Sequence, residues 1–345
     1  TTRIPVHQPR RSILFMDDLA QLRQWTGYVN NIANAYKKSQ ILFTALKADL
    51  FELLVSECSA TDIAAKVGGS ERGISMLLDG LVAIDLVQKK NGRYKNLPIA
   101  QTCLTKGGSA YQGNILHHNL SSWDAWAALD ERVRTGTCAP RSERTGDALR
   151  NFILGMSNIA TLSAREVLAA VDLSGYTRLL DLGGGPGTYA ITFLKAHDQM
   201  AATLFDRPEV VEIAKEQVQI AGLESRFNYI KGDCLSSDIG TGYDLVLVSN
   251  LIHSFSNEEN ARLVKKVYNA LAPGGAVLIK DFIVENDRSG PPYSLIFALH
   301  MLVHTPGGGT FTYEEIQGWT DAAGFDAGTN ISLTPQTRLW IAKKP

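Results

Sequence analysis

The sequence carries almost no net charge, and this bounds the class of partner it can bind. Its 345 residues include 34 lysines and arginines against 35 aspartates and glutamates, for a formal net charge of −1. A protein that binds the phosphate backbone of a nucleic acid normally has an excess of lysine and arginine over acidic residues. We therefore expect no nucleic-acid partner, although a small basic patch is compatible with this composition.

The chain also lacks long apolar runs and paired cysteines. No stretch approaches the roughly 18 consecutive apolar residues of a membrane-spanning helix, and TTRIPVHQPRRSILFMDD at the start contains no apolar segment typical of a secretory signal. Widely spaced cysteines without a CxxC pair indicate free thiols in a reducing compartment. The four are Cys58, Cys103, Cys138 and Cys234. These absences predict a cytoplasmic protein without a membrane partner.

The second half of the chain alternates apolar runs with amphipathic segments. Helices are expected at 208–222 and 257–275, the second stopped by Pro273 and the glycine pair just before the next strand. Strands are expected at 177–183, 201–206, 227–233, 243–250 and 275–284. Strands that alternate with helices of this length build a doubly wound, mostly parallel α/β sheet.

The first half follows a different pattern. Apolar residues recur at helical spacing over 35–54, and 61–87 is typical of a helix, a Gly-Gly turn and a second helix. The segment 87–100 predicts a hairpin with Asn91-Gly92 at its tip. Two helices followed by a hairpin indicate a winged helix, and a length of 345 residues favours two domains. DNA binding is the alternative, but the second helix offers only Arg72 as a base-reading side chain, so packing or dimerisation is favoured.

A glycine-rich turn follows the first strand of the second half, in DLGGGPG. Gly183, Gly185 and Gly187 form GxGxG, and Thr188 stands where a dinucleotide site would place its last glycine. Asp181, just before the turn, would repel a pyrophosphate. No Gly-Lys-Ser/Thr phosphate-binding sequence is present. The turn therefore favours a ligand that carries a positive charge.

Two more carboxylates end the next strands. Asp206 closes the second strand and can accept hydrogen bonds from both ribose hydroxyls, while Asp233 can accept one from an adenine amino group. With Asp181 they lie at the carboxyl ends of three successive strands, where ligands bind in such sheets. A nucleoside with a cationic tail and no phosphate is S-adenosylmethionine. The alternative is that these are ordinary turn and cap residues.

At this point the sequence resembles the S-adenosylmethionine-dependent O-methyltransferases of the caffeate, flavonoid and acetylserotonin type, including their bacterial natural-product branch. DLGGGPG, FDRPEVV, KGDC, NLIHSF and LAPGGAVLIKDFIV match the family's motifs in order from about residue 33 onward. The resemblance implies a Rossmann-like methyltransferase domain at 171–345 and a helical connector at 109–170 that lines the substrate pocket. It also implies a mainly α winged-helix domain at 1–108 that forms a homodimer.

The resemblance implies roles for individual residues. His253 would be the general base, because histidine titrates near neutral pH, and Asp281 would orient it for methyl transfer to a hydroxyl of a small aromatic molecule. The cofactor-binding residues would be Asp181, Gly183, Gly185, Asp206, Arg207, Asp233, Cys234 and Ser249. The substrate-binding residues would be Met156, His300, Met301, His304 and Thr310.

The sequence departs from the family pattern at two of these positions. Thr310 stands where a second carboxylate is expected, and Ser249 where plant relatives often have a lysine. The first departure leaves open a non-methylating reaction such as hydroxylation, decarboxylation or a pericyclic step, or methylation of carbon or nitrogen. His300 and His304 have the i, i+4 spacing of metal ligands, but we expect them to line the substrate pocket without a metal.

Overall fold

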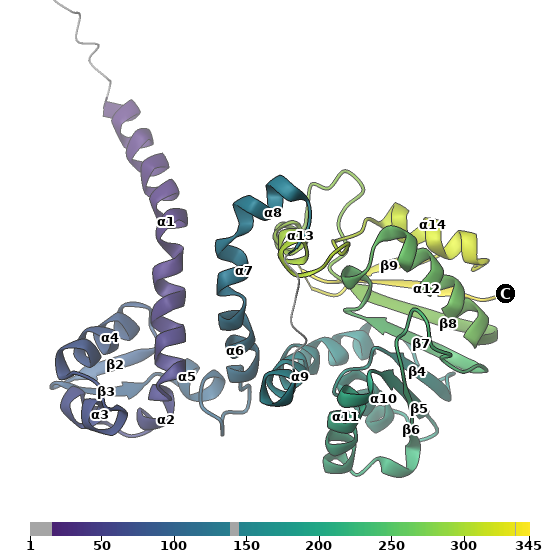
Figure 1. The fold of residues 1–345 in the computed structure, drawn as a ribbon, viewed down its shortest axis with the longest axis horizontal. Helices are drawn as coiled ribbons and strands as arrows, with labels where there is room; N and C mark the ends of the chain where they lie inside the picture. The colour runs from purple at the N-terminus through teal and green to yellow at the C-terminus, as the bar shows by residue number, and fades with distance from the viewer. Residues whose placement is uncertain (1–15, 139–144, 335) are drawn as a thin grey trace, which may run out of the picture. The chain divides into compact units, whose positions relative to one another are not determined.

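The computed structural model describes residues 16–138, 145–334 and 336–345. The chain divides into two compact units, Thr1–Ser109 and Ala110–Pro345, which are described separately (Figure 1). The start of the N-terminal domain expected at 1–108 lies outside the described residues, as does the segment TTRIPVHQPRRSILF.

The first unit combines helices with a small antiparallel sheet of order β1-β3-β2. Asn91 and Gly92 both have positive φ, 50° and 74°, as a two-residue hairpin turn between β2 and β3 requires. The predicted helix–turn–helix and hairpin are thus confirmed. The elements are α1 (Met16–Lys47), α2 (Leu50–Leu53), β1 (Cys58–Ser59), α3 (Ala60–Val67), α4 (Glu71–Ala83), β2 (Val87–Lys90), β3 (Arg93–Asn96) and α5 (Pro98–Cys103).

The helix expected at 35–54 is two helices instead of one. α1 begins at Met16 and ends at Lys47, and Asp49 then takes a left-handed conformation (φ 49°) before α2. A short polar side chain tolerates this conformation, so the chain turns there. Along α1 a series of large apolar side chains is exposed within the unit, most of them three or four residues apart: Leu19, Leu22, Trp25, Tyr28, Val29, Ile32 and Tyr36.

The second unit begins with helices and continues as an alternation of strands and helices. The helices are α6 (Gly113–Ser121), α7 (Trp123–Ala127), α8 (Leu129–Thr135), α9 (Gly146–Ala170), α10 (Thr188–Ala196), α11 (Pro208–Ala221), α12 (Asn257–Ala270), α13 (Pro292–His304) and α14 (Tyr313–Ala323), with 3₁₀ turns η1 (Glu224–Arg226) and η2 (Ile252–Ser254). The strands are β4 (Arg178–Leu182), β5 (Ala201–Asp206), β6 (Phe227–Lys231), β7 (Tyr243–Ser249), β8 (Leu271–Asp281), β9 (Thr329–Ser332) and β10 (Arg338–Lys343).

These strands form one sheet of order β6-β5-β4-β7-β8-β10-β9. The pairs from β6 to β8 are parallel, whereas β10 runs antiparallel to both β8 and β9. One apolar core lies on each face of the sheet, which explains why β4 and β7 have almost uninterrupted apolar sequences. The strand order reverses between β4 and β7, and such a reversal opens a crevice at the carboxyl ends of the strands. The predicted doubly wound, mostly parallel sheet is confirmed.

The boundary between α12 and β8 differs from the expectation. The helix ends at Ala270, and β8 starts at once at Leu271 instead of after the glycine pair. Tyr243 pairs with Leu271 but Leu245 pairs with Ala276, so the APGG segment bulges out of the ladder. A proline inside such an irregularity does not have to donate a ladder hydrogen bond, and it therefore does not exclude the strand.

Among the described residues, no helix is both long and apolar enough to cross a membrane.

Candidate functional site

The glycine turn after β4 takes backbone conformations that a side chain would strain. Gly183 has φ 70° and Gly185 φ 56°, values that glycine adopts at little cost. A Cβ at Gly183 would lie 3.0 Å from a methyl carbon of Leu251, so the turn also needs the space. Gly187 then precedes the first residue of α10. Backbone amides at such a turn can approach a ligand closely.

The carboxylate of Asp206, at the end of β5, is fixed by this turn. Its Oδ2 accepts a hydrogen bond from the Gly185 N–H at 2.9 Å, and its Oδ1 accepts one from the Arg207 N–H at 2.7 Å. Burial raises the pKa of the Asp206 carboxyl, and the two backbone hydrogen bonds partly oppose this rise. The structure therefore brings Asp206 and the glycine turn together, as the sequence predicts.

Asp233 and Cys234 follow the end of β6. The Asp233 carboxylate accepts a hydrogen bond from the Leu235 N–H at 2.7 Å, and the side chain is otherwise exposed. Burial raises the pKa of the Cys234 thiol to about 11, so this sulfur is protonated at neutral pH. The pair thus offers an acceptor and a weakly polar surface next to Asp206.

A single cavity of about 770 Å³ connects this region to the helices of the second unit. Its wall includes most of the predicted cofactor-binding and substrate-binding residues together with the predicted base. These residues are Gly183, Gly185, Asp206, Arg207, Asp233, Cys234, His253, Met156, His300, Met301 and His304. Ligand pockets in proteins typically occupy about 300–1,000 Å³, so the cavity is large enough for a cofactor and a small substrate side by side.

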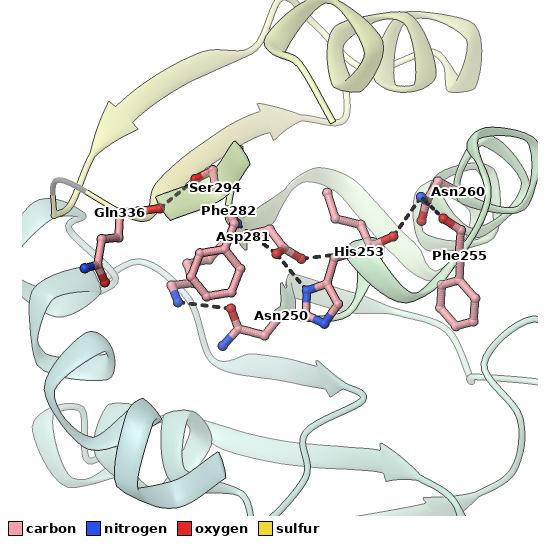
Figure 2. A network of polar contacts seen from close by, with 10 residues as sticks. Asn250, His253, Phe255, Asn260, Asp281, Phe282, Ser294 and Gln336 are labelled. Carbon is pink, nitrogen blue, oxygen red and sulfur yellow. Dashed lines mark hydrogen bonds and ion pairs between the residues drawn. The ribbon is translucent and has the colours of Figure 1, made fainter. Parts of the chain in front are cut away.

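His253 lies on η2, directly after β7, and contacts Asp281 at the end of β8. His253 Nδ1 and Asp281 Oδ1 are 2.8 Å apart, and the His253 backbone N–H faces Oδ2 of the same carboxylate at 3.4 Å (Figure 2). The side chain of His253 is 13 % exposed and that of Asp281 is 3 % exposed. The buried carboxylate therefore fixes both the ring and the backbone of His253.

The charge state of Asp281 follows from its neighbours. Burial by itself raises the pKa of this carboxyl, but the adjacent His253, the Phe282 N–H and Lys280 outweigh burial and hold the pKa below its ordinary value. An ionised carboxylate can only accept hydrogen bonds, so the proton of a neutral His253 ring lies on Nδ1. The Nε2 lone pair is then free to act as a base, on the side of the ring turned away from Asp281 (Figure 2).

The turn that carries His253 is anchored from below by Asn260 on α12. The fully buried Asn260 amide donates to the Ile252 carbonyl at 2.9 Å and to the Phe255 carbonyl at 3.4 Å. Figure 2 shows both contacts. His253 therefore sits on a turn that is held both by Asp281 and by Asn260.

Aromatic rings form the wall next to His253. The ring of Phe297 on α13 meets the His253 ring edge to face at 5.0 Å between centroids, and it lies 4.2 Å from the Phe282 ring. Tyr293 and His300 extend the row along α13, with centroids 6.2 Å and 5.5 Å from that of Phe297. Such a wall suits a flat, unsaturated ligand.

Three predicted site residues lie behind or beside this cavity. Asp181 is only 2 % exposed, under the glycine turn, and burial raises the pKa of its carboxyl to about 7. Ser249 is partly buried near the Tyr189 hydroxyl. Thr310 lines a small hollow together with His253 and Asp281, and its hydroxyl has no hydrogen-bond partner among the described residues. Direct ligand contact by these three stays a prediction.

The sequence matches two family models. Residues 139–326 match an O-methyltransferase domain, and residues 30–106 match an O-methyltransferase dimerisation domain. The chain belongs to the O-methyltransferase family. It is 31% identical over 306 residues to 3-hydroxy-5-methyl-1-naphthoate 3-O-methyltransferase of Streptomyces sahachiroi, a match covering 86% of this chain and 88% of that protein.

Further relatives agree with this assignment. Acetylserotonin O-methyltransferase of Gallus gallus is 30% identical over 316 residues, covering 85% of this chain and 90% of that protein. The crystal structure of human N-acetylserotonin methyltransferase in complex with SAM superposes with a TM-score of 0.85 at 27% identity, covering 93% of this chain and 98% of that one. This O-methyltransferase therefore uses S-adenosylmethionine as its cofactor.

The residues present fit this cofactor. Gly185 lines the cavity, and no atom of the described residues lies within 4 Å of the position that a Cβ would take there, so the turn leaves room for close approach of a ligand. Asp206 and Asp233 supply the acceptors that a ribose diol and an amino group require. Among the described residues, no group of three or more histidine, cysteine or acidic side chains is placed to hold a metal ion.

Several residues near the site, Lys280 and Trp126 among them, were not found from the sequence. Lys280 is fully buried and donates a hydrogen bond from Nζ to Asn250 Oδ1 at 3.1 Å. Trp126 on α7 lines the cavity and donates a hydrogen bond from Nε1 to His300 Nδ1 on α13. No local pattern marks these contacts, because each joins segments far apart in the chain. The positions 293, 297, 300 and 304, by contrast, share one helix face, and this spacing could have indicated the aromatic wall.

Proposed function

We propose that this O-methyltransferase transfers the methyl group to a hydroxyl of a small aromatic molecule, with His253 as general base and Asp281 as its positioning partner. The observation that carries the proposal is the 2.8 Å contact between His253 Nδ1 and Asp281 Oδ1 at the wall of the cavity. Neither side chain would be buried in this way by packing alone, since an unpaired buried carboxylate is costly.

The proton movement follows from the tautomer. S-adenosylmethionine supplies a methyl group on a positively charged sulfur. His253 Nε2 would accept the proton of the substrate hydroxyl while that oxygen takes the methyl group, whose bond to sulfur breaks with its electron pair left on the sulfur as a neutral thioether. The imidazolium that results is stabilised by the carboxylate of Asp281. The two buried residues therefore hold the base in one orientation and support its charged form.

The cofactor would lie along the ends of β4, β5 and β6. In this proposal Asp206 accepts from the ribose hydroxyls, and Asp233 accepts from the adenine amino group. Gly183 and Gly185 allow close approach of the backbone. Arg207 and Cys234 complete the cavity wall at this end, while Asp181 and Ser249 support the turn from behind.

The aromatic character of the substrate is supported by the cavity wall. Phe282 and Phe297 meet at 4.2 Å next to His253, and Met156, Met301 and His304 line the same space. Relatives of this chain are named for aromatic acceptors, among them a hydroxynaphthoate. We therefore place the substrate ring against Phe297, with its hydroxyl toward His253.

The N-terminal unit supports a homodimer. Residues 30–106 match the family's dimerisation domain, and the exposed apolar face of α1 includes Trp25 at 59 % and Tyr28 at 68 % exposure. A second copy of the chain would cover such a surface. Sedimentation at micromolar concentration should give twice the monomer mass, and a monomeric species at that concentration would contradict the dimer.

The base assignment is tested by replacing His253. We expect H253A to lose about 10²- to 10⁴-fold in kcat with a panel of phenols and naphthols, while calorimetry shows unchanged binding of S-adenosylmethionine. H197Q, in the loop after α10 and away from the cavity, is the matched control and should keep the parental rate. If H253A transferred the methyl group at the wild-type rate, His253 would not be the general base.

A second candidate reaction follows from the Thr310 hollow. Because Thr310 stands where the family resemblance places a carboxylate, the same site could use the charge of the cofactor while a substrate carboxylate leaves as CO₂ and its carbon takes up a proton. The panel assay distinguishes the two: a product that gains no methyl group while the cofactor is not consumed would favour this alternative.

A further inference from the structure

The loop between α13 and α14, residues 305–312, contacts the backbone of the proposed base. The Gly309 N–H donates a hydrogen bond to the His253 carbonyl at 3.0 Å. The His253 N–H faces Oδ2 of Asp281 at 3.4 Å. Both polar backbone atoms of His253 therefore have a contact, the N–H with the end of β8 and the carbonyl with the 305–312 loop.

Gly308 allows the loop to come this close. A Cβ at this position would collide with the His253 carbonyl oxygen and would lie 2.5 Å from Thr305 Oγ1, to which the Gly308 N–H donates at 3.0 Å. The φ of Gly308 is outside the left-handed region, so the position needs glycine for space and not for conformation. Any side chain here would push the loop and the His253 carbonyl apart.

The next glycine in the loop tolerates a side chain. A Cβ at Gly309 would meet no atom of the described residues within 4 Å, and its φ is also outside the left-handed region. A small side chain at this position would leave the Gly309 N–H in place to reach the His253 carbonyl. The two neighbouring glycines therefore distinguish a need for close approach at His253 from a general sensitivity of the loop to substitution.

The far end of the loop is held by Arg288, in the segment before α13. Its Nη1 donates to the Thr310 carbonyl at 3.2 Å, and its Nη2 donates to the two carboxylate oxygens of Glu315 at 3.2 Å and 3.1 Å. Glu315 lies in the first turn of α14 and also accepts a hydrogen bond from the Thr312 N–H at 2.7 Å. One guanidinium group thus joins the loop to the helix that follows it.

The Arg288–Glu315 pair is too exposed to add much to the stability of the whole fold. The two side chains are 51 % and 33 % exposed, and water and salt weaken ion pairs at such positions. Thr310, by contrast, is buried and lines the small hollow beside His253 and Asp281. The contact between Arg288 and Thr310 therefore connects a side chain at the surface to the surroundings of the base.

We propose that Gly308 and Arg288 are positioning residues for His253. Gly308 allows the loop to reach the His253 carbonyl, and Arg288 keeps the loop there. Neither residue is among those that line the 770 Å³ cavity, so both act through His253. A displacement of about 1 Å in a reacting group can cost on the order of 100-fold in rate. The inference rests on the proposed function, because it takes His253 to be the base.

The role of Gly308 is tested by comparing G308A with G309A. With the panel of phenols and naphthols, we expect G308A to lose about tenfold to 100-fold in kcat. The KM and the calorimetric affinity for the demethylated cofactor should stay at their wild-type values. G309A is the matched control and should keep the wild-type kcat. Equal losses in the two variants would overturn the proposal, because the close approach at position 308 would then not be the cause.

R288Q provides a second variant, which should fold because the pair it breaks is exposed. We expect kcat to fall about threefold to tenfold, with KM and the unfolding temperature unchanged. R288K can still donate to the Thr310 carbonyl and should recover part of this loss. K215Q, which breaks an exposed ion pair with Glu212 on α11, is the matched control. A wild-type kcat in R288Q would contradict the role of Arg288.

NMR on protein labelled with ¹⁵N-histidine separates this inference from the proposed function. The ring signals of His253 are identified by their absence in H253A. We expect them to move in G308A and R288Q, because a displaced ring changes its contact with Asp281, and to stay in place in G309A and K215Q. Unmoved signals in G308A, with H253A inactive, would contradict the inference and leave the function intact. Moved signals in G308A, with H253A fully active, would contradict the function and leave the positioning of His253 by the loop intact.

Discussion

Lys280 Nζ donates a hydrogen bond to Asn250 Oδ1 at 3.1 Å, under the turn that carries His253. The backbone of Asn250 has φ 52°, and its N–H donates to the Lys280 carbonyl at 2.8 Å. Burial lowers the pKa of the Lys280 ammonium to about 8, while the nearby Asp281 and Glu166 carboxylates oppose this effect. One buried side chain thus supports both the strained residue before the turn and the charge of Asp281.

Replacing this ammonium should move the pH profile of the enzyme. In K280M a positive charge beside the buried His253–Asp281 pair is lost, so the pair takes up a proton at higher pH and the acidic limb of kcat/KM moves to higher pH. We expect kcat at neutral pH to fall roughly tenfold, since a loosened turn misplaces the base. K195M, at an exposed position on α10, should match the wild type. An unchanged acidic limb in K280M would show that Lys280 does not support Asp281.

The carboxylate of Asp281 is expected to matter more for rate than for binding. D281N keeps the shape of the side chain but removes the charge that stabilises the protonated His253. We expect kcat to fall roughly 100-fold or more, with the calorimetric affinity for the demethylated cofactor unchanged. Circular dichroism of the variant controls for misfolding. A large loss of cofactor affinity with little change in kcat would show that Asp281 does not support His253 during methyl transfer.

Asp206 should behave in the opposite way. D206N retains an oxygen that can accept from the Gly185 N–H, but it cannot offer a charged acceptor to the ribose hydroxyls. A hydrogen bond to a charged group is worth about 1.5–3 kcal/mol, so calorimetry should show cofactor affinity reduced about tenfold to 100-fold. D198N, in the loop before β5, is the matched control. If D206N bound the cofactor with wild-type affinity, the ribose would not bind at Asp206.

The buried Asp181 predicts a pH dependence of stability in the free protein. Its pKa is raised to about 7 in the folded state from an ordinary value of 3.8, so the folded state retains the proton more strongly than the unfolded state. Stability from this group is full below the ordinary value and is lost as pH rises through about 7. Urea unfolding of the wild type should therefore show a lower free energy of unfolding at pH 8 than at pH 5.

D181N removes this titration and should reduce the difference between the two pH values. D172N, at a surface turn before β4, is the control and should retain the wild-type difference at these pH values. An equal pH dependence in D181N and the wild type would show that other groups are responsible.

The sheet and its acidic strand ends could be predicted from the sequence because they depend on local patterns. Apolar runs buried on both faces indicate parallel strands, and Asp206 is marked by its place at the end of one of them. Asn91-Gly92 predicted the hairpin for the same reason, since two consecutive positive φ angles select these residues.

What could not be predicted depends on contacts between distant segments or on exceptions to local rules. The start of β8 at Leu271 was missed because Pro273 ordinarily ends an element, whereas here a bulge accommodates it. The Lys280 contact was missed because a lysine in a strand is expected to face water. Trp126 and His300 are 174 positions apart in the sequence, and only the packing of two helices brings them together.

The bond between Asp206 and the Gly185 N–H has a consequence for how the cofactor enters. The carboxylate and the glycine loop fix each other through a 2.9 Å hydrogen bond between protein atoms, so contacts within the protein set the positions of both groups that the proposed site offers to the sugar. Such preorganisation lowers the entropic penalty of association. The proposed nucleoside end of the pocket is in this sense preorganised by contacts within the protein.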